Sequence, residues 1–143
     1  MRVGILGRSK NIIHLIELLE EENHKIEFLV SSKHEKHHGI SLKDLEKFFQ
    51  KKEIKFINSL DFTFIEKKIS LVDIVLSMNF RTMIPIGFIN KFKFGVLNSH
   101  AGDLPKYIGN ATTAWSILQK EKKITVSIHK MNEKLDEGFV IIK

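Results

Sequence analysis

Short apolar runs recur along the chain and are separated by segments of mixed polarity. Five of these runs are nearly continuous: RVGILG (2–7), KIEFLVS (25–31), EIKFIN (53–58), VDIVLSM (72–78) and GVLN (95–98). Continuous apolar runs of this length are typical of strands that are buried on both faces, as in a parallel sheet. The first two thirds of the chain are therefore expected to supply five strands.

The segments between the runs have apolar residues at helical spacing. NIIHLIELLEEEN (11–23) follows the first run, and SLKDLEKFF (41–49) follows the second. Ser41 is placed as an N-cap three residues before Asp44, which is a pattern typical of a helix start. Further helices are expected over residues 60–69, around 87–91, and in a segment that includes Ala114, Trp115, Ile117 and Leu118.

The end of the chain changes from helical spacing to strict alternation. ITVSIHKM (124–131) alternates apolar and polar residues, NEKLDEG (132–138) reads as a turn, and FVIIK (139–143) reads as a last strand. The elements together predict one α/β domain with a Rossmann-like, open, mostly parallel twisted sheet and helices on both faces. Because the sequence stops in a strand that no helix covers, we expect further C-terminal sequence or a partner at that edge.

Composition narrows the classes of function. The chain has 143 residues and no Cys, and no leader-like start or apolar stretch of membrane-spanning length, so a soluble cytoplasmic protein without a membrane partner is expected. Its net charge is +6, yet only three of its 23 basic residues are Arg. Since Arg is favoured for base and phosphate contacts, specific nucleic-acid binding is not expected as the main role. The positive charge would also favour anionic small substrates.

The loop after the first run is a candidate anion site. GILGRSKN (4–11) has only two of the three glycines of a dinucleotide fingerprint. Arg8, Ser9 and Asn11 could still hold an anion at the start of the helix. The alternative is a simple turn that Ser9 caps.

A second loop, SSKHEKHHGI (31–40), carries His34, His37 and His38. Three imidazoles could bind a metal, but the loop offers no convincing carboxylate or Cys partner at ligand spacing. A solvated loop is the favoured interpretation. No metal is therefore expected.

The segment NSHAGDLPKYIGN (98–110) is the strongest candidate site. Asn98 and His100 lie two residues apart at the carboxyl end of a predicted strand, so their side chains point to one side, and in open α/β sheets ligands bind at that end. Asp136 follows in the turn LDEG, where its carboxylate could reach the same crevice. For His100 considered alone, a hydrogen-bonded loop histidine is the favoured interpretation, and the expected approach of Asp136 shifts the balance towards a functional site.

The segment from residue 95 to 142 resembles the folate-dependent formyltransferases. The shared pattern is Asn-x-His, Leu-Pro, an aromatic residue before Gly, a helix with Trp, an alternating strand and an Asp-x-Gly turn. In this chain the pattern falls on Asn98, His100, Leu104, Pro105, Tyr107, Gly109, Trp115, Asp136 and Gly138.

The resemblance implies a site and a donor. Asn98, His100 and Asp136 would be the catalytic trio, and 10-formyltetrahydrofolate the formyl donor. The donor would lie against Phe80, Arg81, Thr82, Met83, Ile84, Glu133 and Leu135. The acceptor side is assigned to Arg8, Ser9, Asn11, Asp103, Tyr107, Gly109 and Asn110.

The resemblance also implies an acceptor class. Residues 1–143 would form a catalytic domain that lacks a C-terminal portion, and a homodimer is among the expected partners. The expected acceptor is the amino group of a nucleotide-linked amino sugar, of the dTDP- or UDP-4-amino-4,6-dideoxy type. Alternatives are methionyl-tRNA, glycinamide ribonucleotide, or a truncated domain that binds folate or nucleotide without catalysis.

One departure from the family bears on the acceptor. Many members read His-Pro-Ser-Leu-Leu-Pro, whereas this chain has Ala101, Gly102 and Asp103 after the His. Asp103 could contact an ammonium or hydroxyl group of the acceptor. The alternative, that it stabilises a turn, is favoured for the side chain considered alone.

Overall fold

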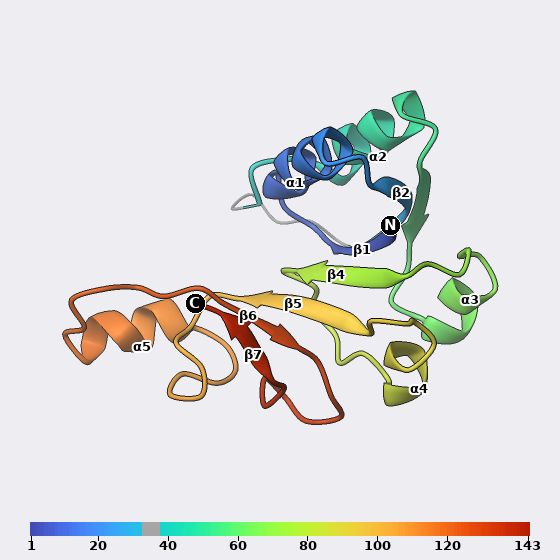
Figure 1. The fold of residues 1–143 in the computed structure, drawn as a ribbon. Coiled ribbons are helices and arrows are strands. Elements are labelled where there is room, and N and C mark those ends of the chain that lie inside the picture. Colours follow the sequence, from blue (N-terminus) through green and yellow to red (C-terminus); the bar gives the residue numbers. More distant parts are fainter. Residues whose placement is uncertain (33–37) are drawn as a thin grey trace.

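The computed structural model describes residues 1–32 and 38–143, and in them a single seven-stranded sheet (Figure 1). The order across the sheet is β3-β2-β1-β4-β5-β6-β7. The five parallel strands are β1 (Arg2–Gly7), β2 (Lys25–Ser31), β3 (Lys55–Asn58), β4 (Ile74–Met78) and β5 (Val96–His100). The antiparallel strands are β6 (Ser127–Lys130) and β7 (Val140–Ile142). The predicted open, mostly parallel sheet is confirmed.

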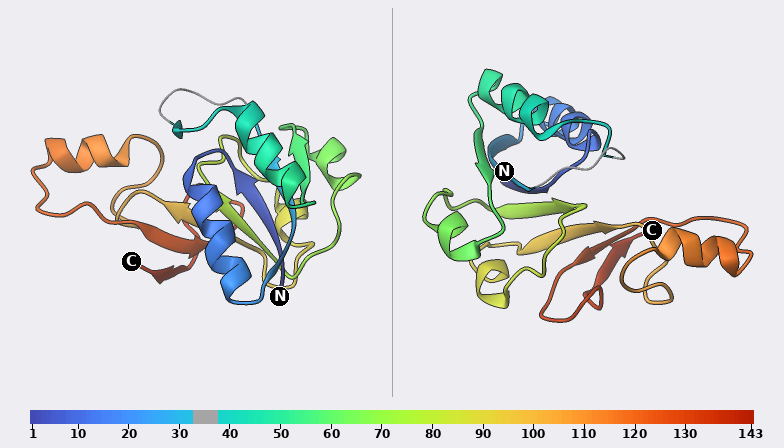
Figure 2. Two further views of the ribbon diagram at one scale, coloured as in Figure 1. Left: turned by 90° about the horizontal axis from the view of Figure 1, so that it is seen from above. Right: turned by 180° about the vertical axis from the view of Figure 1, so that it is seen from behind.

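Helices cover both faces of the parallel part of the sheet (Figures 1 and 2). The helices α1 (Asn11–Glu21) and α2 (Leu42–Lys51) pack on one face, and α3 (Phe62–Glu66) and α4 (Ile86–Ile89) pack on the other. Each pair closes its own buried apolar cluster. Gly4 sits in β1 beneath the ring of Phe28, where a Cβ would lie 2.2 Å from Cζ. The core is therefore fitted tightly around the central strand.

Side-chain caps explain where two helices begin. The Ser41 hydroxyl accepts a hydrogen bond from the Asp44 N–H at 3.1 Å, as predicted. Asp61 caps α3 by accepting from the N–H of Thr63 at 2.9 Å. By contrast, α1 begins after Lys10 without a side-chain cap, and the Ser9 hydroxyl lies 3.9 Å from the sulfur of Met78.

The C-terminal part departs from the expected boundaries. Of the alternating segment 124–131, only Ser127–Lys130 is a strand, and its polar residues are the buried ones: Ser127 is 0% and His129 is 1% exposed. Val126 is 51% exposed. Alternation alone does not say which face is buried, and here the polar face is inside, where Ser127 bonds the loop after β5 and His129 lies beside Asn98. This inversion buries the imidazole of His129.

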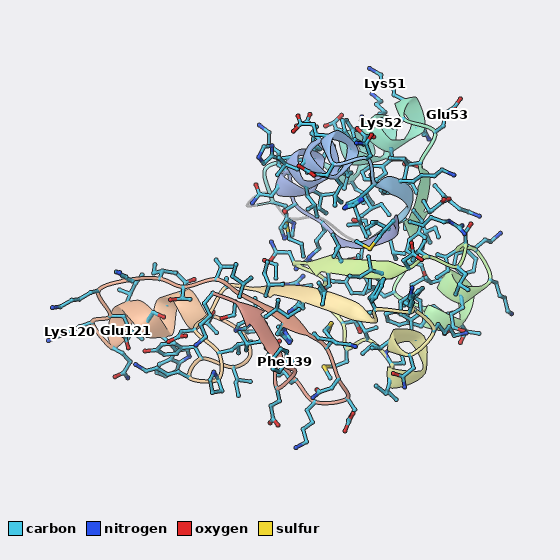
Figure 3. All side chains as sticks on the ribbon, in the orientation of Figure 1. Lys51, Lys52, Glu53, Lys120, Glu121 and Phe139 are labelled. Carbon is cyan, nitrogen blue, oxygen red and sulfur yellow. The ribbon has the colours of Figure 1, made fainter. Side chains whose placement is uncertain are left out.

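The helix α5 (Thr112–Leu118) stands beyond the end of β5, apart from the four other helices (Figure 2). Apolar side chains of this helix are exposed to solvent: Trp115 is 54% and Ile117 is 63% exposed. Phe139, labelled in Figure 3 beside the edge strand β7, is 79% exposed. No helix in residues 1–32 and 38–143 is long and apolar enough to cross a membrane.

Candidate active site

A cavity of about 780 Å³ opens at the carboxyl ends of β4 and β5. The strand order changes direction between β1 and β4. The connections that follow these two neighbouring strands therefore run to opposite faces of the sheet, which leaves a crevice between them. The residues that line the cavity are Arg8, Ser77, Asn79, Phe80, Arg81, Thr82, Met83, Ile84, Asn98, Ser99, His100, Ala101, Gly109, Asn110, Ala111, Thr112, Met131, Leu135 and Asp136.

The pairing of β5 with β6 builds the centre of the site. Asn98 lies opposite His129 and His100 lies opposite Ser127 in the antiparallel register. Because β5 continues to His100 instead of ending at residue 98, Asn98 and His100 point to the same face of the sheet. Cross-strand partners share a face, so four polar side chains meet there.

The carboxylate of Asp136 connects these groups. Its Oδ2 accepts a hydrogen bond from the Gly109 N–H at 3.0 Å and lies 3.5 Å from His100 Nδ1. Its Oδ1 lies 3.6 Å from His129 Nε2. Asp136 is 8% exposed and has a φ of 52°, a left-handed conformation that Asp tolerates better than most residues. The predicted trio of Asn98, His100 and Asp136 thus meets in one place.

The surroundings of Asp136 keep it ionised. Burial alone would raise the pKa of its carboxyl, but His129, the Gly109 N–H and the nearby His100 together outweigh burial and lower that pKa. A carboxylate at neutral pH beside an imidazole stabilises the imidazolium form. The Asp136 carboxylate therefore presents a negative charge to both imidazoles.

The hydrogen bond of His100 fixes its tautomer. Its Nε2 lies 2.8 Å from the backbone oxygen of Tyr107. A carbonyl oxygen only accepts, so Nε2 carries a proton and Nδ1, which faces Asp136, is the nitrogen that can take and release a second one.

The loop after β5 is shaped around this imidazole. A Cβ on Gly102 would lie 2.6 Å from His100 Nε2 and 2.8 Å from the Tyr107 oxygen. The Ser127 hydroxyl donates to the Gly102 oxygen at 2.6 Å and accepts from the Leu104 N–H at 3.2 Å. Gly102 is therefore part of the support of His100.

The residues assigned to the donor lie mainly on the cavity wall. The segment 80–84 and Leu135 line it, whereas Glu133 is exposed and does not. Asn79 lies just before this segment, and its backbone carbonyl accepts a hydrogen bond from Arg8 Nε at 2.8 Å. Phe80 and Ile84 also join the apolar cluster under α3 and α4. This wall combines backbone groups with apolar side chains.

The residues assigned to the acceptor divide into two groups. Arg8, Gly109 and Asn110 line the cavity. Asn11 is exposed at the start of α1, and Ser9 is buried with its hydroxyl 3.9 Å from the sulfur of Met78. The structure does not bring these last two to the cavity.

Asp103 and Tyr107 point their side chains elsewhere. Asp103 pairs with Lys143 at 2.6 Å, and the Tyr107 hydroxyl donates to Glu121 at 2.8 Å. Glu121 lies at the end of α5 that is remote from the sheet (Figure 3). Only the backbone oxygen of Tyr107 reaches the site, through His100.

The histidine-rich loop is described only in part. His34 and His37 lie outside the described residues. His38 is buried, and its backbone oxygen accepts from the Lys10 N–H at 2.9 Å. Within the described ranges, no three His, Asp or Glu residues are grouped as metal ligands would be.

Sequence reasoning missed His129 and Ser127. Both lie on the polar face of the alternating segment 124–131, and that alternation was the available signal. What sequence could not supply was the register that sets His129 opposite Asn98.

Replacing Gly102 with Ala is predicted to destabilise the fold. The added Cβ meets both the His100 ring and a backbone oxygen, and overpacking of this kind costs about 1–3 kcal/mol of unfolding free energy. Urea denaturation measures the change. Gly87→Ala is the matched control, because no atom lies within 4 Å of its added Cβ. Equal stability of the two variants would contradict the packing described.

Asp136→Asn is predicted to give a stability deficit that depends on pH. Since folding lowers the pKa of Asp136, the unfolded chain binds more protons between the two pKa values, and stability gained from ionisation is complete above about pH 4. The gap between wild type and variant should shrink as the pH falls below that value. Urea denaturation from pH 7 to pH 3 measures it. A gap that stays constant or widens in acid would contradict the lowered pKa.

Comparison with known proteins finds a family and several relatives that match this sequence. The family described as formyl transferase matches residues 1–143. GDP-perosamine N-formyltransferase of Brucella melitensis biotype 1 is 35% identical over 71 residues, and methionyl-tRNA formyltransferase of Bacillus velezensis is 41% identical over 80 residues. These matches cover 50% and 55% of this chain but only 27% and 25% of the two relatives.

Solved structures have the same fold. Glycinamide ribonucleotide transformylase 1 from Symbiobacterium toebii has a TM-score of 0.78 at 18% identity, over 99% of this chain and 71% of that one. A formyltransferase from Anoxybacillus kamchatkensis, solved with UDP-4,6-dideoxy-4-formamido-L-AltNAc and tetrahydrofolate, has a TM-score of 0.62 at 21% identity, over 99% and 58%. Because the family matches it from the first residue to the last, this chain belongs to the formyl transferase family.

Proposed function

We propose that the chain is the catalytic part of an N-formyltransferase that moves a formyl group from 10-formyltetrahydrofolate to an amine. The observation that carries the proposal is the meeting of Asn98, His100 and Asp136 in one cavity at the end of β5. Family membership supports formyl transfer, and the tetrahydrofolate in the Anoxybacillus structure supports the donor.

The proposed chemistry needs an oxyanion donor and a proton carrier. The amine nitrogen forms a bond to the formyl carbon, and the bond from that carbon to N10 of the folate then breaks. Between these events the formyl oxygen carries negative charge, which an N–H of the Asn98 amide would stabilise. The amine loses one proton and N10 gains one, and His100 Nδ1 can carry that proton. Asp136 stabilises the resulting imidazolium.

The wall formed by residues 80–84 and Leu135 is proposed to hold the folate ring. A flat heteroaromatic ring has apolar faces and a polar edge, so it suits a wall that combines apolar side chains with backbone N–H and C=O groups. Placed there, the donor would present N10 towards His100 and Asn98 at the centre of the cavity.

The proposed acceptor is the amino group of a nucleotide-linked amino sugar. The Brucella relative acts on a GDP-linked sugar by its name, which adds GDP to the dTDP and UDP forms considered. Arg8 lines the cavity and is suited to a phosphate oxygen. The Bacillus relative supports methionyl-tRNA as a second candidate, although the scarcity of Arg argues against tRNA.

Substitution of the trio tests the catalytic proposal. His100→Asn or Asp136→Asn is expected to lower kcat for formyl transfer by about a hundredfold or more, because each removes charge stabilisation or proton transfer at the reacting group. Product is measured by mass spectrometry, and folding by circular dichroism. Glu66→Gln is the control, since Glu66 pairs with Lys91 on the surface, away from the cavity.

Two outcomes would contradict catalysis by this trio. Unchanged turnover in folded trio variants would remove the proposed roles. Calorimetric binding of folate by the wild-type chain, without product from any acceptor, would favour a binding domain without catalysis.

A panel of acceptors tests the proposed substrate class. The 4-amino-4,6-dideoxy sugars linked to dTDP, UDP or GDP are compared with glycinamide ribonucleotide and with methionyl-tRNA. One of the nucleotide sugars is expected to give a kcat/KM at least about tenfold above the other two classes, as pockets built for particular polar groups discriminate strongly. A preference for tRNA or for the ribonucleotide would overturn the sugar assignment and leave formyl transfer in place.

A further inference from the structure

His129 is a buried imidazole that the proposed chemistry does not use. It lies in β6 directly opposite Asn98 and is 1% exposed. Its Nε2 is 3.1 Å from the Asn98 amide nitrogen, Nδ2, and 3.6 Å from Asp136 Oδ1. Its Nδ1 is buried and has no hydrogen-bond partner among the described residues.

One placement of the His129 proton leaves a buried N–H group without a hydrogen-bond acceptor. If the Asn98 amide nitrogen donates to Nε2, neutral His129 must carry its proton on Nδ1. That N–H is then buried without an acceptor, which is rare because the group loses hydration and gains no bond.

The opposite assignment satisfies all three residues better. With its proton on Nε2, His129 donates that N–H to the Asn98 amide oxygen at the 3.1 Å position, and the same N–H lies on the side of the Asp136 carboxylate, 3.6 Å away. The nitrogen and oxygen of an amide are distinguished only by such networks, so the Asn98 amide is turned by half a rotation. Nδ1 becomes an unpaired acceptor, which is tolerated more readily than an unpaired donor.

The orientation of the Asn98 amide decides whether its oxygen or its N–H groups face the cavity. In the first assignment the amide oxygen is the end left over, and it accepts no hydrogen bond from the described residues. An oxygen repels the negative charge that develops on a formyl oxygen. In the second assignment the amide N–H groups are the end left for the cavity, as an oxyanion donor must be.

We propose that His129 is a positioning residue that carries its proton on Nε2 and thereby holds the Asn98 amide with its N–H groups towards the cavity. The effect on catalysis rests on the proposed function, whereas the tautomer and the amide orientation do not. His129 acts through Asn98 and Asp136 and need not touch either substrate.

The tautomer is measured directly by NMR. In protein labelled with ¹⁵N at His, long-range ¹H–¹⁵N correlations distinguish a protonated Nε2 from a protonated Nδ1. His129→Leu assigns the signals of this residue by their loss. The expected result is the Nε2–H tautomer at neutral pH. The Nδ1–H tautomer would overturn the proposal whether or not the chain transfers formyl groups.

Kinetics separate positioning from a general structural role. His129→Leu is expected to lower kcat about tenfold and to change KM for donor and acceptor less than about threefold. His129→Gln, which can place an amide N–H near the position of Nε2, is expected to recover most of kcat. His129→Asn, which places its amide near Nδ1, is the matched control and is expected not to recover it.

A double variant tests whether His129 acts through Asn98. In an Asn98→Ala background, His129→Leu is expected to lower kcat by less than about twofold further, because the group that it positions is already absent. An additive loss, or full kcat in His129→Leu alone, would overturn the proposal. If wild type transfers no formyl group, the proposed function fails and the NMR result alone decides the tautomer.

Discussion

The carboxylate of Asp136 is the interaction on which the site depends. Its two oxygens reach the Gly109 N–H, His100 and His129, which belong to the loop after β5, to β5 itself and to β6. Without that charge, the buried imidazoles of His100 and His129 would lose a carboxylate that lies within 3.6 Å of each. The turn that presents Asp136 adopts a left-handed backbone at this residue, so local strain is accepted to place the group.

The second constraint is the antiparallel addition of β6 to a parallel sheet. The five parallel strands alone would leave β5 at the edge of the sheet, with the polar side chains of Asn98 and His100 exposed to solvent on that side. The strand β6 closes that side with Ser127 and His129, both buried. Ser127 ties the loop after β5 to the sheet, and Gly102 in that loop lets the imidazole of His100 approach a backbone oxygen. The hydrogen bonds that hold the loop after β5 to the sheet therefore also position His100 in the candidate site.

Much of the fold and the centre of the site could be predicted from sequence. Continuous apolar runs indicated the parallel strands, Ser41 marked the start of α2, and the pair Asn98 and His100 followed from strand geometry at a predicted carboxyl end. These features depend on neighbouring residues. The pairing of Asp103 with Lys143 spans 40 residues and could not be read from spacing.

The placement of His129 marks the limit of sequence reasoning here. Alternation in residues 124–131 indicated a strand but not which face was buried, and the usual assumption would put the apolar face inside. Only the register with β5 reveals that the polar face is inside, and register is a tertiary property. The missed residue therefore lies where sequence patterns carry the least information.

The pKa of Asp136 in the folded protein tests the central role of this carboxylate most directly. A ¹³C NMR titration of its carboxyl carbon is predicted to show a midpoint below the ordinary value for Asp, about 3.9, because the contacts with His129, Gly109 and His100 outweigh burial. The midpoint should rise in His129→Leu. A midpoint at or above the ordinary value in the wild-type protein would contradict the account, because the carboxylate would then not be held by these groups.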